Sequence, residues 1–119
     1  MTEIDQHRLS EELKADEDVL ASLAANGDDS SVVRPIDVHF KGPQPLVETL
    51  ADDAAKLGFR FVGYSEYDDD DLGVDLQVDS RTDRASIAAL TRLALQIEQS
   101  HDVEYDGWGC PAAQAGPAR

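Results

Sequence analysis

Hydrophobic and polar residues alternate in four short stretches of this chain, which is the pattern of β-strands with one buried face. The clearest stretch covers residues 72–79, where every second residue is apolar and the residues between are glycine or polar. An aromatic-rich stretch precedes it across a charged connection, so the two suggest a hairpin. The other predicted strands cover residues 34–41, residues 59–67 and a short segment that begins with Val103 and Tyr105.

Three further stretches repeat apolar residues every three or four positions, which predicts amphipathic helices. They cover residues 16–26, 45–57 and 83–100, the last of them capped by Thr82 or Asp83. Asp16 is the expected N-cap of the first helix, and Gly27 is the expected stop. A weaker apolar pattern at Leu9 and Leu13 either extends this helix or forms a separate piece.

The order strand, helix, strand, strand, helix, strand predicts a ferredoxin-like βαββαβ domain of the α+β class. In this fold two helices cover one face of a four-stranded antiparallel sheet. We expect residues 34–110 to form this domain, residues 1–33 to form an acidic N-terminal helical extension and residues 111–119 to be a disordered tail. The expected core comprises Ile36, Val38, Phe40, Leu50, Val74, Leu76, Ile87, Leu90 and Leu93.

The charge of the chain bears on its partners. It has 25 Asp and Glu against 10 Lys and Arg, a formal net charge of -15 over 119 residues. Affinity for a phosphate backbone comes mostly from cationic side chains, so direct nucleic-acid binding is not expected. We expect a protein partner with a basic binding region.

The single cysteine cannot form an intramolecular disulfide, and no long apolar run follows the first residue. Secretion and membrane insertion therefore lack a signal, and the cytoplasm is the expected compartment. The oligomeric state is not indicated by the sequence.

Strand alternation also predicts which side chains face away from the two helices. They are Asp37, His39, Arg60, Val62, Tyr64, Asp75, Gln77 and Asp79. RNA-recognition modules of this topology carry stacking aromatics and basic groups on that face, whereas this one is acidic. His39 and Tyr64 are candidate anchors for a protein partner; alternatively, the face is solvated or covered by the N-terminal helix.

The run Asp68, Asp69, Asp70 and Asp71 is the densest charge in the chain. It lacks the spaced ligands, central glycine and closing glutamate of a calcium loop, so we expect a solvated connection and no metal. Weak divalent-ion binding and contact with a basic partner are the alternatives. The run is expected to accelerate association with a cationic surface.

His39, Asp106 and Cys110 supply a base, a carboxylate and a thiol, the groups of a nucleophilic cysteine mechanism. Their spacing matches no recognisable base–nucleophile pattern, and Cys110 lies at the edge of the predicted tail. We therefore expect no catalytic activity and no cofactor.

The chain's only Trp and only Cys lie in the stretch Glu-Tyr-Asp-Gly-Trp-Gly-Cys, residues 104–110. Asp106 and the two glycines fit a tight turn, after which Trp108 either folds back onto the domain or anchors a partner. This stretch resembles the C-terminal signature of the bacterial family known as regulator of ribonuclease E activity B. Weaker similarity continues through Asn26-Gly27-Asp28, Val38-His39-Phe40 and Leu57-Gly58-Phe59.

The resemblance implies a ferredoxin-like domain that binds a basic region of an endoribonuclease as a protein and lowers its activity. The candidate partner-binding residues, inferred on physical grounds, are Asp68, Asp69, Asp70, Asp71, His39, Tyr64, Asp106 and Trp108. The competing hypothesis is a small-molecule-sensing or enzymatic ferredoxin-like domain. That hypothesis predicts a concave pocket lined by convergent polar groups, whereas a binding module needs none.

Overall fold

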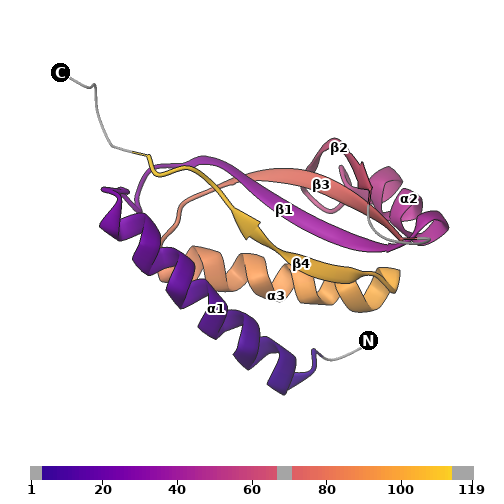
Figure 1. Cartoon of the computed structure of the whole chain (residues 1–119), viewed down its shortest axis with the longest axis horizontal. Coiled ribbons are helices and arrows are strands. Elements are labelled where there is room, and N and C mark those ends of the chain that lie inside the picture. The colour runs from indigo at the N-terminus through magenta and orange to yellow at the C-terminus, as the bar shows by residue number, and fades with distance from the viewer. Residues whose placement is uncertain (1–3, 67–70, 114–119) are drawn as a thin grey trace.

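Four strands form one antiparallel sheet in the spatial order β2-β3-β1-β4 (Figure 1). The structure is a computed structural model of the chain and describes residues 4–66 and 71–113. The strands are β1 (Arg34–Pro43), β2 (Arg60–Glu66), β3 (Asp71–Ser80) and β4 (Glu104–Gly109). Their order and directions confirm the predicted ferredoxin-like fold of the α+β class.

The helices in the described part of the chain are α1 (Gln6–Ala25), α2 (Gln44–Asp53) and α3 (Arg84–His101). Helix α2 packs against β1 and β3, and α3 packs against β4. Helix α1 lies alongside α3 (Figure 1). None of these helices has the length and apolarity needed to cross a membrane.

Helix α1 begins earlier than predicted, and Asp16 is not its N-cap. The cap is Asp5, whose carboxylate accepts hydrogen bonds from backbone N–H groups of the first turn. Gly27, with φ of 83°, follows the helix and has the left-handed conformation that ends it, as predicted. Leu9 and Leu13 thus extend the same helix.

The predicted core is confirmed. Eight of its nine expected members are buried, and Leu93 is partly buried against the same cluster. The residues of β1 and β3 that face the helices are apolar at every second position, as the strand period requires. Helix α1 adds Leu9 and Leu23, so the N-terminal extension shares the core of the domain.

Helix α2 and strand β1 also end at other residues than the sequence predicts. Helix α2 ends at Asp53 instead of residue 57, and a turn follows in which Phe59 N–H bonds to the carbonyl of Ala54 (2.9 Å). Gly58, with φ of 94°, makes this turn possible. Strand β1 continues through Pro43, because a proline at the last position of a strand interrupts little of the ladder.

Candidate functional site

Strand β4 contains a bulge that turns two aromatic side chains toward the helices. Tyr105 pairs with Phe40 and Trp108 pairs with Val38, so the register shifts by one residue between the two pairs. Residues three apart in a regular strand point to opposite faces, and the bulge removes that conflict. Gly107, with φ of 99°, supplies the left-handed backbone at this point. Both rings are buried as a result.

Asp16 is the acceptor that fixes Trp108 in the core. The indole Nε1–H of Trp108 donates to Asp16 Oδ1 (2.8 Å), and the hydroxyl of Thr91 donates to Asp16 Oδ2 (2.6 Å). One carboxyl group therefore joins α1, α3 and β4. Burial, outweighing these two hydrogen bonds, raises the pKa of Asp16 above its ordinary value.

This raised pKa predicts how stability depends on pH. The unfolded chain releases the Asp16 proton near pH 4, roughly the ordinary aspartate pKa, whereas the folded protein keeps it to a higher pH. The stabilisation is therefore fully present below about pH 4 and is lost as the pH rises through the folded-state pKa. Compared with Asp16→Asn, the wild-type protein should lose unfolding free energy over this window. Denaturant titrations of both proteins from about pH 4 to about pH 8 measure it, and a constant difference would contradict it.

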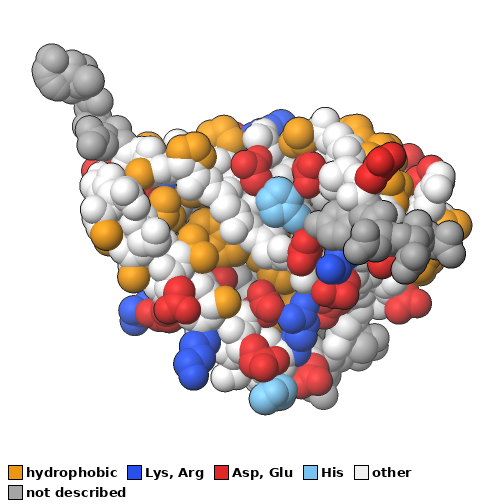
Figure 2. Space-filling model, in the orientation of Figure 1, with side chains coloured by type: hydrophobic (Ala, Val, Ile, Leu, Met, Phe, Trp, Pro, Cys, Tyr) orange, Lys and Arg blue, Asp and Glu red, His pale blue; other side chains and the backbone are white. Residues whose placement is uncertain are grey.

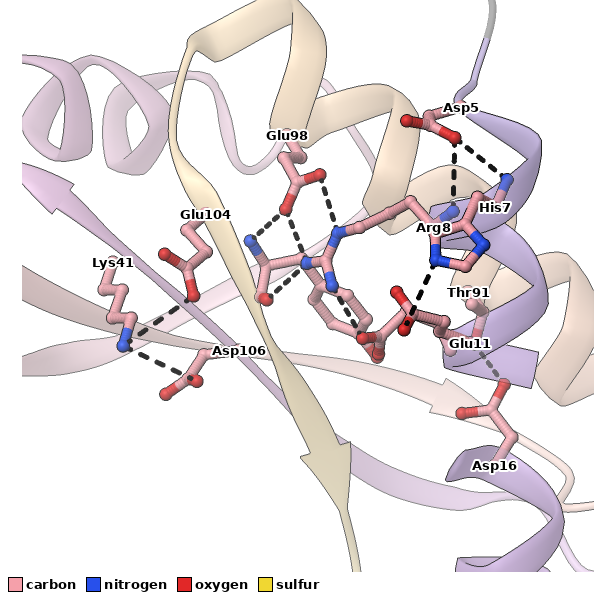
Figure 3. Close-up of polar contacts among 12 residues, drawn as sticks. Asp5, His7, Arg8, Glu11, Asp16, Lys41, Thr91, Glu98, Glu104 and Asp106 are labelled. Carbon is pink, nitrogen blue, oxygen red and sulfur yellow. Dashed lines mark hydrogen bonds and ion pairs between the residues drawn. The ribbon is translucent and has the colours of Figure 1, made fainter. Parts of the chain in front are cut away.

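A second polar contact covers the outer edge of β4 (Figure 3). Arg8 of α1 donates to both carboxylate oxygens of Glu98 (2.8 and 3.2 Å) and to the backbone carbonyl of Tyr105 (3.0 Å). Glu98 also accepts the backbone N–H of Tyr105 (2.8 Å). We call this arrangement the Arg8–Glu98 clasp. It satisfies strand groups that would otherwise be available for pairing with another chain.

A buried ion pair joins the start of β1 to the segment after α1. Arg34 Nη1 donates to Asp28 Oδ1 (2.7 Å), and both side chains are almost fully buried. Asp28 also accepts from Thr82 Oγ1 (2.6 Å) and from the backbone N–H of Ala113 (2.8 Å). Residues 111–113, the described part of the predicted tail, are therefore anchored through Ala113, whose carbonyl also accepts the N–H of Asp29 (2.7 Å).

The side of the sheet turned away from the helices, here called the open face, is acidic. Its described charged residues, assigned from strand pairing, are Asp37, Asp71, Asp75, Asp79, Glu104 and Asp106 against Lys41 and Arg60. Acidic side chains likewise outnumber basic ones on the molecular face shown in Figure 2. Helix α1 lies on the opposite side of the sheet, so it does not cover the open face.

Several side chains of the open face are linked in pairs across the strands. His39 Nδ1 lies 2.7 Å from Asp75 Oδ1, and Arg60 donates to Asp79 (2.8 Å). Lys41 lies between Glu104 and Asp106, with N–O distances of 3.8 and 4.0 Å (Figure 3). These exposed pairs contribute little to stability, and they leave the face with excess negative charge.

Tyr64 does not lie on the open face, contrary to the prediction. The pairing of β2 with β3 shifts between Phe61 and Gly63, so Tyr64 pairs with Val74 and shares its side of the sheet. Val62 is the extra residue of this irregularity. Tyr64 is nevertheless 48 % exposed, because α2 packs over β1 and β3 and leaves this edge uncovered.

The remaining candidate residues are dispersed. Asp68, Asp69 and Asp70 lie outside the described residues, and Asp71 is the exposed first residue of β3. Trp108, a proposed partner anchor, is 9 % exposed and serves the core. Within residues 4–66 and 71–113, no group of three or more His, Cys, Asp or Glu side chains is placed to hold a metal ion.

The groups considered for cysteine catalysis have separate partners. His39 bonds to Asp75, whereas the Cys110 thiol lies 3.9 Å from Arg34 Nη1. Burial raises the pKa of Cys110, which favours the thiol over the nucleophilic thiolate. Among the hydrogen bonds of the described residues, none joins the imidazole of His39 to this thiol. The arrangement does not form a base–nucleophile pair.

A groove between α1 and α3 bears on the small-molecule hypothesis. It has a volume of about 150 Å³ and is lined mainly by the apolar residues Leu13, Leu20, Ile87 and Ala88. Ligand pockets are typically about 300–1,000 Å³ with convergent polar groups. The groove is smaller, and the Glu17–Arg84 ion pair at its lining is exposed to solvent. It does not favour a small-molecule site.

Sequence reasoning missed the role of Asp16, although a signal was present. Leu9, Leu13, Leu20 and Leu23 are spaced by four, seven and three residues, and Asp16 fills the gap in this helical stripe. An acidic residue at a position that faces the core needs buried donors. The indole of Trp108 was a donor available to meet this need.

Comparison with known proteins identifies relatives over most of the chain. The model of a family described as Regulator of ribonuclease activity B matches residues 13–110. A protein of that name from Pseudoalteromonas atlantica is 34% identical over 98 residues, which cover 78% of this chain and 84% of the relative. A protein with the same name from Shewanella amazonensis is 32% identical over 77% of this chain and 69% of the relative. Another from Photobacterium profundum is 26% identical over 85% of this chain and 81% of the relative.

Proposed function

Because this chain belongs to the Regulator of ribonuclease activity B family, we propose that it lowers the activity of a ribonuclease E-type endoribonuclease by binding it as a protein. The family match over residues 13–110 is the observation that carries this proposal. It includes the β4 bulge, Trp108 and Asp16, which accepts the indole N–H of Trp108, so it covers one of the contacts that join the N-terminal helix to the domain.

The acidic open face supports contact with a basic protein region. Its carboxylates exceed its cations, and the chain as a whole carries a net charge of -15. Such a surface repels RNA phosphates and attracts Lys- and Arg-rich segments, which raises the association rate and selects partners. Regulation would then act through the nuclease and not through capture of its RNA substrate.

We further propose that the chain is not itself an enzyme. Its thiol and imidazole bond to different groups, and burial favours the protonated thiol. The binding role requires none of these groups to react. In the proposed function the nuclease carries out the chemistry, and this chain acts only by binding to it.

The proposal is tested by titrating the purified chain into a cleavage assay of an E-type endoribonuclease from the same organism. The cleavage rate is expected to fall with increasing chain and to saturate, while the chain alone cleaves no RNA. An unchanged cleavage rate at saturating concentration would contradict the proposal. Turnover by the chain alone, lost in Cys110→Ala or His39→Ala, would favour an enzyme instead.

The aspartate run at residues 68–71 is expected to accelerate association with the nuclease. Replacing Asp68, Asp69, Asp70 and Asp71 with Asn should slow association by roughly 2- to 10-fold at low ionic strength and leave the unfolding free energy unchanged. Stopped-flow or surface-binding kinetics measure the rate.

A matched control changes the same number of charges at scattered exposed sites. Its substitutions are Glu11→Gln, Asp18→Asn, Glu48→Gln and Asp52→Asn. It should slow association less than the clustered variant, because clustered charge produces the stronger local field. Equal slowing by both variants would show that only net charge matters.

A further inference from the structure

The two edge strands of the sheet, β4 and β2, differ in whether other groups bond to their outer backbone. On β4, the Arg8–Glu98 clasp occupies the backbone N–H and carbonyl of Tyr105 and blocks pairing with another strand there. On β2, by contrast, no side chain or loop among the described residues bonds to the backbone; its described backbone pairing is with β3. One edge of the sheet is therefore closed and the other is open.

The open edge also carries the most exposed large apolar side chains of the described domain apart from Val33. Phe61, Val62 and Tyr64 are 47 %, 53 % and 48 % exposed. The rings of Phe61 and Tyr64 contact each other edge to face, with centroids 5.0 Å apart. Aromatic pairs held in this way lose little entropy on binding and commonly anchor interfaces.

The face of the sheet is also open at the centre of β2. A side chain placed on Gly63, which shares the open face with Asp75, would meet no atom within 4 Å. Exposed edge strands with apolar neighbours bind extended peptides by adding a strand, in which main-chain hydrogen bonds give affinity and side-chain contacts give selectivity.

The charge around β2 selects the kind of segment that fits. The strand ends at the exposed Glu66, and the neighbouring strand β3 begins at the exposed Asp71. Arg60, at its other end, already donates to Asp79 (2.8 Å). A second copy of this chain would add its own net charge of -15 to this interface, whereas a basic segment would neutralise the carboxylates already there.

We propose that the edge of β2 is the docking site for an extended Lys- or Arg-rich segment of the protein partner, which adds to the sheet as a strand and places an apolar side chain on Phe61 and Tyr64. This inference rests on the proposed function, since it names the surface by which the nuclease is held. In this arrangement Glu66 and Asp71 attract the basic segment, and the aromatic pair retains it.

The first test compares variants for binding to the nuclease. The double variant Phe61→Ser, Tyr64→Ser should weaken equilibrium binding by at least about tenfold. Val33→Ser is the matched control, because Val33 is 59 % exposed and lies outside β2, and it should bind like the wild type. Circular dichroism and thermal unfolding confirm that both variants fold.

The second test probes strand addition directly with a synthetic peptide, Arg-Val-Arg-Tyr-Arg-Val-Arg, and with two versions that are N-methylated at alternate residues, one in each register. The unmodified peptide should protect β2 amides from hydrogen exchange. One of the two possible N-methylation registers should weaken binding by at least about tenfold, because it removes the donors that face the strand.

The outcomes separate this inference from the proposed function. If the wild-type chain fails to bind the nuclease, the proposed function is wrong, and the peptide experiment still decides whether β2 accepts a basic strand. If the wild type binds but the double variant binds equally well, the β2 inference is overturned and the proposed function stands. Equal binding of all peptide versions would exclude strand addition. A wild-type dimer converted to a monomer by the double variant would make a second copy the occupant and overturn the inference.

Discussion

Replacing Arg34 with alanine is expected to lower the unfolding free energy by about 3–5 kcal/mol, the usual effect of breaking a buried ion pair on one side. The guanidinium donates to Asp28 Oδ1 and to the carbonyls of Asp29 and Val32. Its removal leaves a buried carboxylate without its counter-charge. Two carbonyls also lose a donor, so the segment between α1 and β1 loses its attachment.

The control for this substitution is Arg81→Ala, since Arg81 is exposed. It should change the unfolding free energy by no more than about 0.5 kcal/mol. Urea denaturation of the three proteins at neutral pH gives the comparison. Equal losses in both variants would mean that the Asp28–Arg34 pair has no special role.

Leu76→Ala is expected to lower the unfolding free energy by about 2–5 kcal/mol. Leu76 is fully buried in β3, pairs with Val38 of β1 and faces the helices, so truncation leaves a cavity at the centre of the core. Val62→Ala, at a half-exposed position on the edge strand, should cost less than about 1 kcal/mol. The same urea titrations measure both, and a loss below about 1 kcal/mol for Leu76→Ala would contradict the central position of this residue.

The regular part of the fold was predictable because local pattern and tertiary packing agree there. In β3, Leu72, Val74, Leu76 and Val78 alternate with glycine or polar residues, and the structure turns this apolar set toward the helices. Asp83 caps α3 by accepting the N–H of Ser86, as the sequence suggested. No competing interaction displaces these elements.

Prediction failed where a bulge changes the strand period. Strict alternation put Tyr64 on the open face, but the irregularity between Phe61 and Gly63 moves it to the other side. A bulge in β4 likewise brings Tyr105 and Trp108 to one face. The sequence sign of this second bulge is Gly107, since glycine readily adopts the positive φ of 99° that the bulge requires.

The candidate site was predictable in its charge and not in its geometry. The sequence shows the excess of carboxylates, yet it does not show that Arg8 and Glu98, 90 residues apart, meet at the edge of β4. It also does not show that the helices leave Phe61 and Tyr64 uncovered. Both features arise from how helices sit on the sheet, which residue spacing within one element cannot reveal.

The most direct test of the account is calorimetric titration of the purified chain with the endoribonuclease after nuclease treatment has removed all RNA. We expect binding to persist without RNA and to weaken progressively as the salt concentration rises, because exposed charges are screened over about 10 Å at 0.1 M. Binding that disappears when RNA is removed, or that does not respond to salt, would contradict direct recognition of a basic protein region by this acidic surface.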